Sequence, residues 1–234
     1  MGDVLREAVC KANRELARLK LVTLTWGNTS GVDRARGLFY IKPSGVPYEE
    51  LTPEHMVPIR LANGQPIETR WRPSSDTPTH WRLYQAFDNI GGITHTHSPF
   101  AVAFAQARRS IPCLGTTHAD TFRGEIPLTR LLTESEVEEA YEDWTGRVIV
   151  ERFQSLDVRA TPGVLVAGHA PFTWGKDPME SVHHSLILEE VARMAWTTLM
   201  LRPDVPPLPD WISRKHYERK HGPNATYGQS GGKT

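Results

Sequence analysis

Three histidines and an aspartate, far apart in the chain, have the residue types of a divalent metal site. His95 and His97 are two residues apart in an expected strand, Asp76 follows a serine pair, and His169 follows an apolar run. Because side chains two residues apart on a strand point to the same face, His95 and His97 could hold one ion. Three imidazoles and a carboxylate suit zinc, manganese or cobalt and leave a position open for exchange.

Several polar segments have the composition of an anion site. They are Gly27-Asn28, Lys42 to Gly45 and Ser74-Ser75, which offer amide, ammonium and hydroxyl groups and accessible backbone N–H groups. The serine pair precedes an expected helix start, where the free N–H groups and the helix dipole favour an anion. A phosphate monoester would suit this collection. The alternative interpretation is that turn geometry alone selects these residues.

Candidates for acid and base catalysis are less specific. Asp120 lies in a short polar segment, where it could transfer a proton or cap a turn. Tyr227 lies near the C-terminus, and His216 belongs to a charged stretch, 214–221, of a kind that usually forms a solvated helix face. Composition leaves these roles open. The remaining histidines considered, His55, His80, His183 and His184, have the pattern of structural residues.

The expected elements alternate between helices and strands. Apolar spacing and capping residues predict helices over 3–20, 77–88, 98–108, 134–144 and 177–201, with Thr77 capping the second. Strands are predicted over 38–41, 147–153 and 163–167, with a further strand ending at His97, and 25–31 is predicted to be a polar turn. This order favours helices packed on both faces of a sheet.

Bulk composition excludes several classes of protein. The 234 residues fit one domain, and 27 basic residues balance 27 acidic ones, which argues against a dedicated nucleic-acid binder. Two cysteines provide no disulfide framework and are compatible with a reducing compartment. No apolar run is long enough to cross a bilayer, and the N-terminus lacks an apolar signal core. We therefore expect a cytoplasmic protein with no membrane or nucleic-acid partner.

The polar motifs together resemble the class II aldolase/epimerase family, from about residue 6 to residue 229. The motifs are Trp26-Gly27-Asn28, Lys42-Pro43-Ser44-Gly45, Ser74 to His80, His95 to Ser98, Thr117 to Asp120, His169 to Gly175, Arg219 to Gly222 and Tyr227-Gly228-Gln229. The resemblance implies a three-layer α/β/α sandwich with a mixed, largely antiparallel sheet. It also implies a single domain over 1–234, whose tail from about 203 reaches a neighbouring subunit's site in a homotetramer.

The resemblance assigns roles to individual residues. It implies that Asp76, His95, His97 and His169 bind a divalent ion, with zinc expected and manganese or cobalt as alternatives. A phosphate cradle would consist of Asn28, Lys42, Ser44, Gly45, Ser74 and Ser75. Asp120 and Tyr227 would be the acid/base pair, assisted by His216, with Tyr227 and His216 coming from the neighbouring subunit.

The implied activity is epimerisation of a phosphorylated pentulose, L-ribulose 5-phosphate, to D-xylulose 5-phosphate by cleavage and re-formation of the C3–C4 bond. Asp76 looks like the epimerase pattern, because a glutamate stands there in the fuculose-phosphate type of aldolase. Ala170, Thr121 and Thr29 depart from the family pattern without removing a proposed site residue. The alternatives are a sugar-phosphate aldolase and a non-catalytic adducin-like scaffold, and the intact histidine set favours an enzyme.

Overall fold

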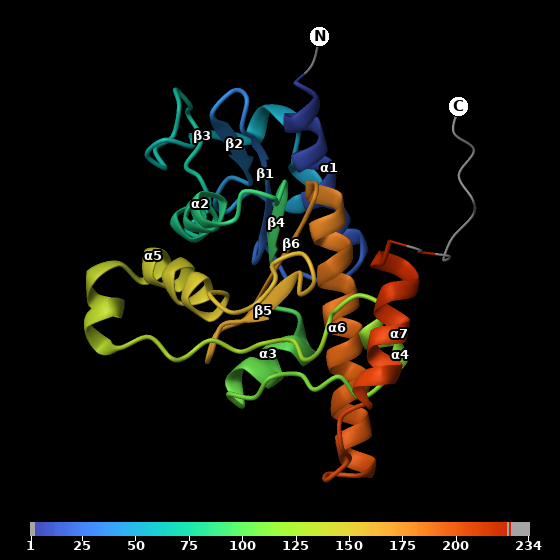
Figure 1. Ribbon diagram of the computed structural model, residues 1–234. Coiled ribbons are helices and arrows are strands. Elements are labelled where there is room, and N and C mark those ends of the chain that lie inside the picture. The colour runs from blue at the N-terminus through green and yellow to red at the C-terminus, as the bar shows by residue number, and fades with distance from the viewer. Residues whose placement is uncertain (1–2, 224, 226–234) are drawn as a thin grey trace, which may run out of the picture.

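The computed structural model describes residues 3–223 and 225, so the predicted Tyr227 lies outside the described residues. A six-stranded sheet in the order β3-β2-β1-β4-β6-β5 forms the middle layer (Figure 1). Its strands are β1 Asn28–Asp33, β2 Leu38–Ile41, β3 Val57–Arg60, β4 Gly92–His95, β5 Gly163–Leu165 and β6 Pro171–Gly175. All neighbouring pairs of these described strands are antiparallel, and an isolated bridge between Leu128 and Leu165 is parallel, which agrees with the predicted largely antiparallel sheet.

Helices cover both faces of the sheet, which confirms the predicted three layers. They are α1 Val4–Arg18, α2 Thr77–Ala86, α3 Pro99–Gln106, α4 Thr116–Ala119, α5 Glu134–Arg152, α6 Pro178–Leu201 and α7 Asp210–His221, with short 3₁₀ turns η1 Tyr48–Glu50 and η2 Pro53–His55. Helices α2 and α5 pack together on one face, and α1 and α6 lie on the other (Figure 1). No described helix is long and apolar enough to span a membrane.

Each face of the sheet has its own buried core. On the α2 and α5 side, Phe39 of β2, Leu83 of α2, Ile149 of α5 and Trp174 of β6 are buried in one apolar cluster. On the opposite face, α1 and α6 pack together in a second cluster. Helix α3 packs against the C-terminal half of α6 in a third cluster. Burial of these side chains is the main force that holds the sheet edges and loops in place.

Strand β1 corrects the prediction of a turn at 25–31. The segment is polar, yet β1 is a central strand because its buried side chains find partners on both faces. Thr29 Oγ1 lies 2.9 Å from Thr94 Oγ1, and Ser30 Oγ lies 2.7 Å from His80 Nδ1. Since buried polar groups are tolerated when hydrogen-bonded, a strand with threonine and serine side chains can occupy the middle of a sheet.

Residues 147–152 of the predicted strand 147–153 form the last part of helix α5 instead, and Phe153 is its C-cap residue. Val148 and Ile149 are β-branched, which favours a strand in isolation, but tertiary packing decides the outcome here. Gly146 lets α5 approach α2 closely, since a Cβ atom at this position would lie 2.7 Å from Arg82 Cβ. The helix is broken at Ala140, whose φ of −168° is extended.

The start of helix α2 differs from the prediction by one residue. Asp76, rather than Thr77, is the N-cap residue, and Pro78 lies in the first turn. The Asp76 side chain makes no capping hydrogen bond, in contrast to Asp3, Thr133 and Asp177, which cap their helices as predicted. The carboxylate at the start of α2 is therefore available for other contacts.

Gly92 lies where the sheet packs tightly against the start of α6. A Cβ atom at this position would lie 2.5 Å from Pro178 Cα, and the neighbouring backbone atoms of Asp177 are equally close. Because backbone cannot move aside easily, we expect Gly92→Ala to lower the free energy of unfolding by about 1–3 kcal/mol. Gly115→Ala is the matched control, since its Cβ would meet open space. Urea denaturation of both variants measures the difference, and equal stabilities would contradict this packing.

Candidate active site

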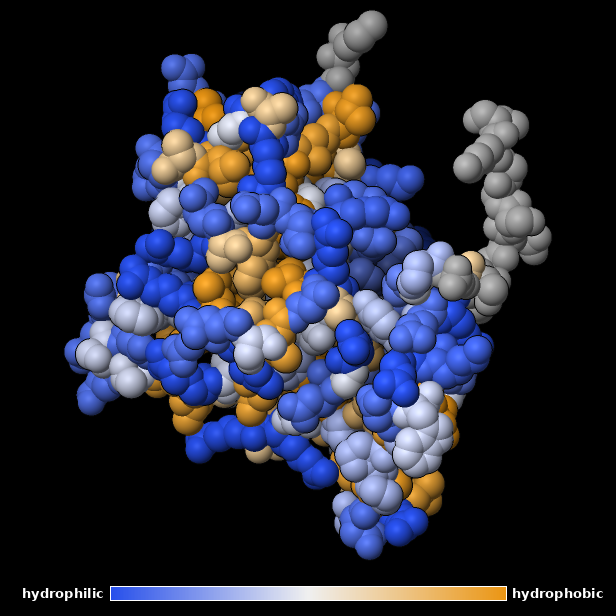
Figure 2. Space-filling view, in the orientation of Figure 1, coloured by the Kyte–Doolittle hydropathy of each residue, from blue (hydrophilic) through white to orange (hydrophobic). Residues whose placement is uncertain are grey.

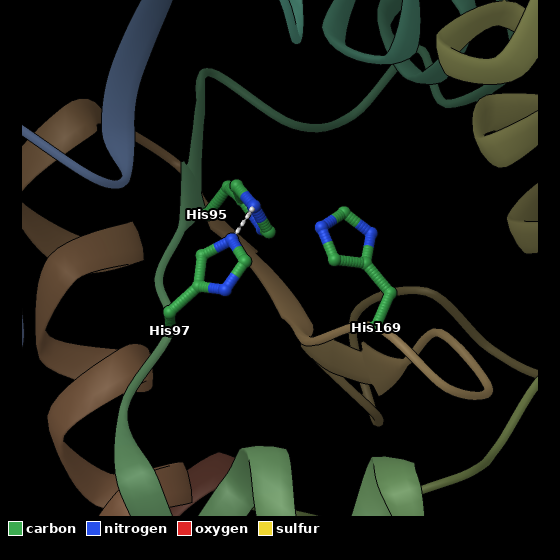
Figure 3. Close-up of side chains that lie close together, drawn as sticks. All are labelled: His95, His97 and His169. Atoms are coloured by element: carbon green, nitrogen blue, oxygen red, sulfur yellow. Dashed lines mark hydrogen bonds between the residues drawn. The ribbon is translucent and has the colours of Figure 1, made fainter.

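His95, His97 and His169 gather at one end of strand β4. His95 is the last residue of β4, His97 lies two residues further, and His169 lies in the turn between β5 and β6, after Gly168 at φ +73°. One nitrogen from each ring lies within 4.8 Å of the others, and the rings point toward one another (Figure 3). The prediction that His95 and His97 share a face holds, although the strand ends before His97.

This histidine cluster fits a divalent metal. His95 Nδ1 lies 3.0 Å from the carbonyl oxygen of Pro171, so a proton at Nδ1 leaves the lone pair of Nε2 facing the cluster. His95 Nε2 and His97 Nε2 are 3.1 Å apart, close to the roughly 3.3 Å expected for two nitrogens on a tetrahedral zinc ion. Nδ1 of His169 is buried without a hydrogen-bond partner among the described residues.

Burial keeps the imidazoles in the neutral form that binds metals. It lowers the pKa of His95 to about 3 and that of His169 to about 4, and it also lowers the pKa of His97. Neutral rings at physiological pH present lone pairs rather than protons to an ion. The donor set therefore suits zinc or a similar borderline cation.

Asp76 lies beside the histidine cluster but outside its 4.8 Å group. The Asp76 Oδ2 atom accepts a hydrogen bond of 2.6 Å from Asn28 Nδ2, and it also lies 3.4 Å from Ser74 Oγ. Asn28 is opposite His95 in the β1–β4 register, which brings the amide and the imidazole to the same end of the sheet. The carboxylate predicted as a fourth ligand thus lines the same cavity and is held by Asn28 rather than by its own helix.

One cavity joins the histidines to the predicted phosphate cradle. Its volume is about 480 Å³. The cavity is lined by all four predicted metal ligands, by all six predicted cradle residues, Asn28, Lys42, Ser44, Gly45, Ser74 and Ser75, and by Thr25, Trp26, Gly27, Pro43, Tyr141 and Glu142. Residues from six separate segments of the chain therefore meet around a space of small-molecule size.

The far side of this cavity has the chemistry of an anion site. Lys42 is only 2% exposed, and no carboxylate of the described residues lies within ion-pair distance of it. Its Nζ atom lies 3.3 Å from the Pro43 carbonyl oxygen and 4.9 Å from the centre of the Tyr48 ring. Burial lowers the pKa of Lys42 to about 8, so the ammonium form still dominates at neutral pH. An unpaired buried ammonium favours a bound anion.

The two serine loops are held side by side by backbone hydrogen bonds. Ser44 N donates to the Arg72 carbonyl oxygen at 2.9 Å, and Ser74 N donates to the Lys42 carbonyl oxygen at 3.0 Å. Ser75 directly precedes Asp76, the N-cap residue of α2, at a helix start where free N–H groups and the dipole attract negative charge. The sequence prediction that these loops share one site is therefore consistent with their placement.

Asp120 lies elsewhere, in a cationic cluster with residues of α7. His216 Nδ1 lies 3.0 Å from Asp120 Oδ1, and Arg219 Nη2 donates to Asp120 Oδ2 at 2.8 Å. Lys220 Nζ lies 3.3 Å from the same oxygen. Burial works to raise the pKa of Asp120, but the surrounding cationic groups outweigh it and hold that pKa below its usual range. Asp120 and His216 are thus one unit within a single chain.

This Asp120 cluster is at the opposite end of the sheet from the histidines. Strands β4 and β6 pair His95 with Phe172 and Gly92 with Gly175, so Gly175 marks the far end. Thr121 and His221 share a small cavity with Gly175. Helix α7, which carries His216, has no buried residue and a hydrophilic outer face (Figure 2). Asp120 therefore does not reach the metal cavity of its own chain.

Four cavity residues were not among the sequence predictions of the site: Thr25, Trp26, Tyr141 and Glu142. The Trp26 ring centre lies 6.2 Å from that of His97, and the Tyr141 ring centre lies 5.9 Å from that of His169. Both rings remain partly exposed at 53% and 37%. Trp26 belongs to the motif Trp26-Gly27-Asn28, so the sequence offered a reason to include it among the site residues. Tyr141 depends on the break at Ala140, which no sequence pattern indicates.

A family model for the class II aldolase and adducin N-terminal domain matches residues 7–196. The chain belongs to this family. Its match covers the histidines, the serine loops and Asp120, whereas His216 and Tyr227 lie beyond it. The resemblance predicted from the motifs is confirmed.

The chain is also similar to curated epimerases. It is 52% identical over 225 residues to the L-ribulose-5-phosphate 4-epimerase UlaF of Salmonella typhi, covering 96% of this chain and 98% of that protein. The protein of the same name from Salmonella paratyphi C is 51% identical over the same length. At this level of identity, the prediction of an enzyme with epimerase or aldolase chemistry is confirmed, and the scaffold alternative is set aside.

Solved structures establish the fold independently. An L-fuculose 1-phosphate aldolase superposes with a TM-score of 0.78 at 22% identity, covering 94% of this chain and 97% of that one. An L-fuculose-1-phosphate aldolase from Thermus thermophilus gives a TM-score of 0.67 at 22% identity, covering 87% of this chain and 100% of that one. At such low identity these likenesses concern the fold alone.

Proposed function

We propose that this protein is a divalent-metal-dependent 4-epimerase that converts L-ribulose 5-phosphate to D-xylulose 5-phosphate. The observation that carries the proposal is one cavity that joins three neutral histidines and a carboxylate to a buried lysine, which has no ion-pair partner among the described residues. A pentulose phosphate has the matching ends, with carbonyl and hydroxyl oxygens at one end and a phosphate at the other. The curated relatives carry the name of this activity.

In this proposal His95, His97, His169 and Asp76 hold the ion, which is zinc by preference, with manganese and cobalt as alternatives. When bound, the ion supplies Lewis-acid stabilisation of negative charge on the substrate oxygens. The carbonyl oxygen of Pro171 orients His95, and the amide of Asn28 orients Asp76. These contacts orient His95 and Asp76 before any substrate arrives.

The proposed phosphate cradle holds the other end of the substrate. Lys42 provides the charge, Ser44, Ser74 and Ser75 provide hydroxyls, and the loop at Gly45 brings its backbone close. This tether matters for the chemistry, because the C4 hydrogen is not acidic and inversion requires the C3–C4 bond to break. Cleavage gives the enediolate of dihydroxyacetone and glycolaldehyde phosphate. The aldehyde group of the tethered glycolaldehyde phosphate rotates, and the C3–C4 bond re-forms on the opposite face of its carbonyl.

Proton transfer requires a base for the C4 hydroxyl and an acid on the opposite face. We assign these steps to Asp120 and Tyr227, with His216 contacting Asp120 at 3.0 Å. Since Asp120 lies at the far end of its own sheet, it serves the cavity of a neighbouring subunit in this proposal. The proposed homotetramer places its sites at subunit interfaces, with the tail from about 203 reaching across. The whole chain forms a single cytoplasmic domain.

The direct test is to incubate the zinc-loaded protein with L-ribulose 5-phosphate and to follow D-xylulose 5-phosphate. We expect the reaction to reach an equilibrium mixture of the two pentulose phosphates without accumulation of free glycolaldehyde phosphate. Stoichiometric release of that fragment would instead indicate an aldolase, and an unchanged pentulose would reject both activities. A chelator-treated sample is the control for metal dependence.

The pH profile tests the role of Lys42. Because burial lowers the pKa of its ammonium to about 8, the charge that attracts phosphate is present below this pH and is lost above it. We expect kcat/KM to fall by up to about tenfold per pH unit above pH 8, since this parameter reports the free enzyme.

Lys42→Met is the corresponding variant. It should lower kcat/KM at pH 7 and remove this alkaline limb, because the titrating group is gone. An alkaline limb that persists in the variant would assign the titration to another residue.

A further inference from the structure

Three buried side-chain atoms lack a hydrogen-bond partner among the described residues. They are Asn28 Oδ1, His80 Nε2 and His169 Nδ1. Two belong to residues that line the metal cavity, but His80 does not line it and is completely buried beneath it. His80 lies one helical turn after Asp76, and its backbone N donates to the Asp76 carbonyl oxygen at 3.0 Å. A buried polar atom left unpaired next to a metal site calls for a role.

A chain of hydroxyl groups determines which nitrogen of His80 carries the proton. Tyr84 Oη and Ser30 Oγ are 2.8 Å apart, and Ser30 Oγ lies 2.7 Å from His80 Nδ1. Burial raises the pKa of Tyr84, so the phenol keeps its proton and donates it to Ser30. With Tyr84 as donor to Ser30, the Ser30 hydroxyl proton is left to point at His80 Nδ1. Each hydroxyl proton then has an acceptor, and the proton of neutral His80 is placed on Nε2.

The unpaired donor and the unpaired acceptor lie on the same face of the sheet. Ser30 and Asn28 are two residues apart on β1, so their side chains point the same way. Ser30 contacts His80 of α2, and Asn28 contacts Asp76 at the start of the same helix. His80 is also near enough to Asp76 and His95 for their charges to affect its pKa. His80 Nε2–H and Asn28 Oδ1 are therefore complementary groups behind one metal ligand.

We propose that His80 is a positioning residue for Asp76. One buried water accepts a hydrogen bond from His80 Nε2–H and donates one to Asn28 Oδ1. This holds the amide of Asn28 in the orientation in which Nδ2 donates to Asp76 Oδ2. The inference rests on the proposed role of Asp76 as a metal ligand. The hydrogen-bonded series Tyr84, Ser30, His80 and Asn28 thereby supports the site. His80 then does more than fill space in the core.

The test measures zinc affinity by competition with a chelator. His80→Phe keeps a ring but removes both nitrogens, and we expect the Kd for zinc to rise about tenfold or more, as for other losses of outer-shell support. His80→Gln keeps an acceptor for Ser30 and a donor for the water, and should restore affinity to within about threefold. His118→Phe is the matched control, because it removes another buried histidine whose Nε2 contacts Gly124 outside the metal cavity.

Wild-type affinity in the His80→Phe protein, or equal weakening in the phenylalanine and glutamine variants, would overturn the inference. Nitrogen-15 NMR of the wild-type protein adds a readout that needs no core variant to fold, since it distinguishes the two tautomers of His80. We expect the Nε2–H form, and the Nδ1–H form would overturn the inference. If the wild-type protein binds no zinc at all, the proposed function fails instead, so the two failures are distinguishable.

Discussion

His97→Asn should abolish metal binding and turnover together. His97 is the exposed member of the histidine cluster, and its Nε2 lies 3.1 Å from that of His95. Removing one imidazole leaves two, and an amide is a poor ligand for zinc. Because loss of an outer-shell contact already costs ten- to hundredfold, we expect affinity to fall by about a hundredfold or more. Metal analysis after dialysis and an epimerase assay measure both effects.

The control for this variant is His183→Asn, on the exposed face of α6. It changes the same residue type by the same substitution without touching the cavity, so metal content and activity should match the wild type. Retention of stoichiometric zinc by His97→Asn would remove His97 from the ligand set. Loss of turnover with metal retained would move His97 to a role in substrate contact.

Two inactive variants should restore activity when they assemble together. Asp120→Asn should lower kcat by about 10²–10⁴-fold while metal stays bound, because the Asp120 cluster lies away from the chain's own histidines. In a ring of subunits, a chain with intact histidines can meet a neighbour with intact Asp120. Random mixing of His97→Asn and Asp120→Asn chains then yields about a quarter of the wild-type sites in a heterologous ring.

Co-expression of the two variants with different affinity tags provides the mixed assemblies. The separately purified variants, mixed without subunit exchange, are the control and should stay inactive. If each site were built from a single chain, every mixed assembly would also stay inactive. Size-exclusion chromatography with light scattering gives the subunit number independently.

The sequence indicated which polar residues would line one cavity better than it predicted the surrounding elements, because the candidate chemistry is concentrated in short polar motifs. The proximity of His95 and His97 follows from strand periodicity alone. The convergence of His169 and Asp76 on them required the family resemblance, since no local pattern reports distances across a sheet. For the same reason, the placement of Asp120 at the other end of β4 and β6 was not foreseeable. Tyr227 lies outside the described residues and stays a prediction.

The fold predictions failed where local preference and tertiary context disagree. Strand β1 can be polar because its hydroxyl groups form hydrogen bonds with residues of α2 and β4. A single sequence does not identify these partners. Residues 147–153 have the β-branched composition of a strand, but they form helix because Ile149 packs into the core shared with α2. His80 has the features of a structural histidine in the sequence, and only its unpaired nitrogen gives a reason to assign it more.

The unused capping position at α2 implies a conflict between durability and turnover. A side chain that caps a helix usually contributes about 1 kcal/mol, and Asp76 forgoes this bond. In the proposed function, the acid at this position therefore serves the metal cavity at the expense of the helix that it begins.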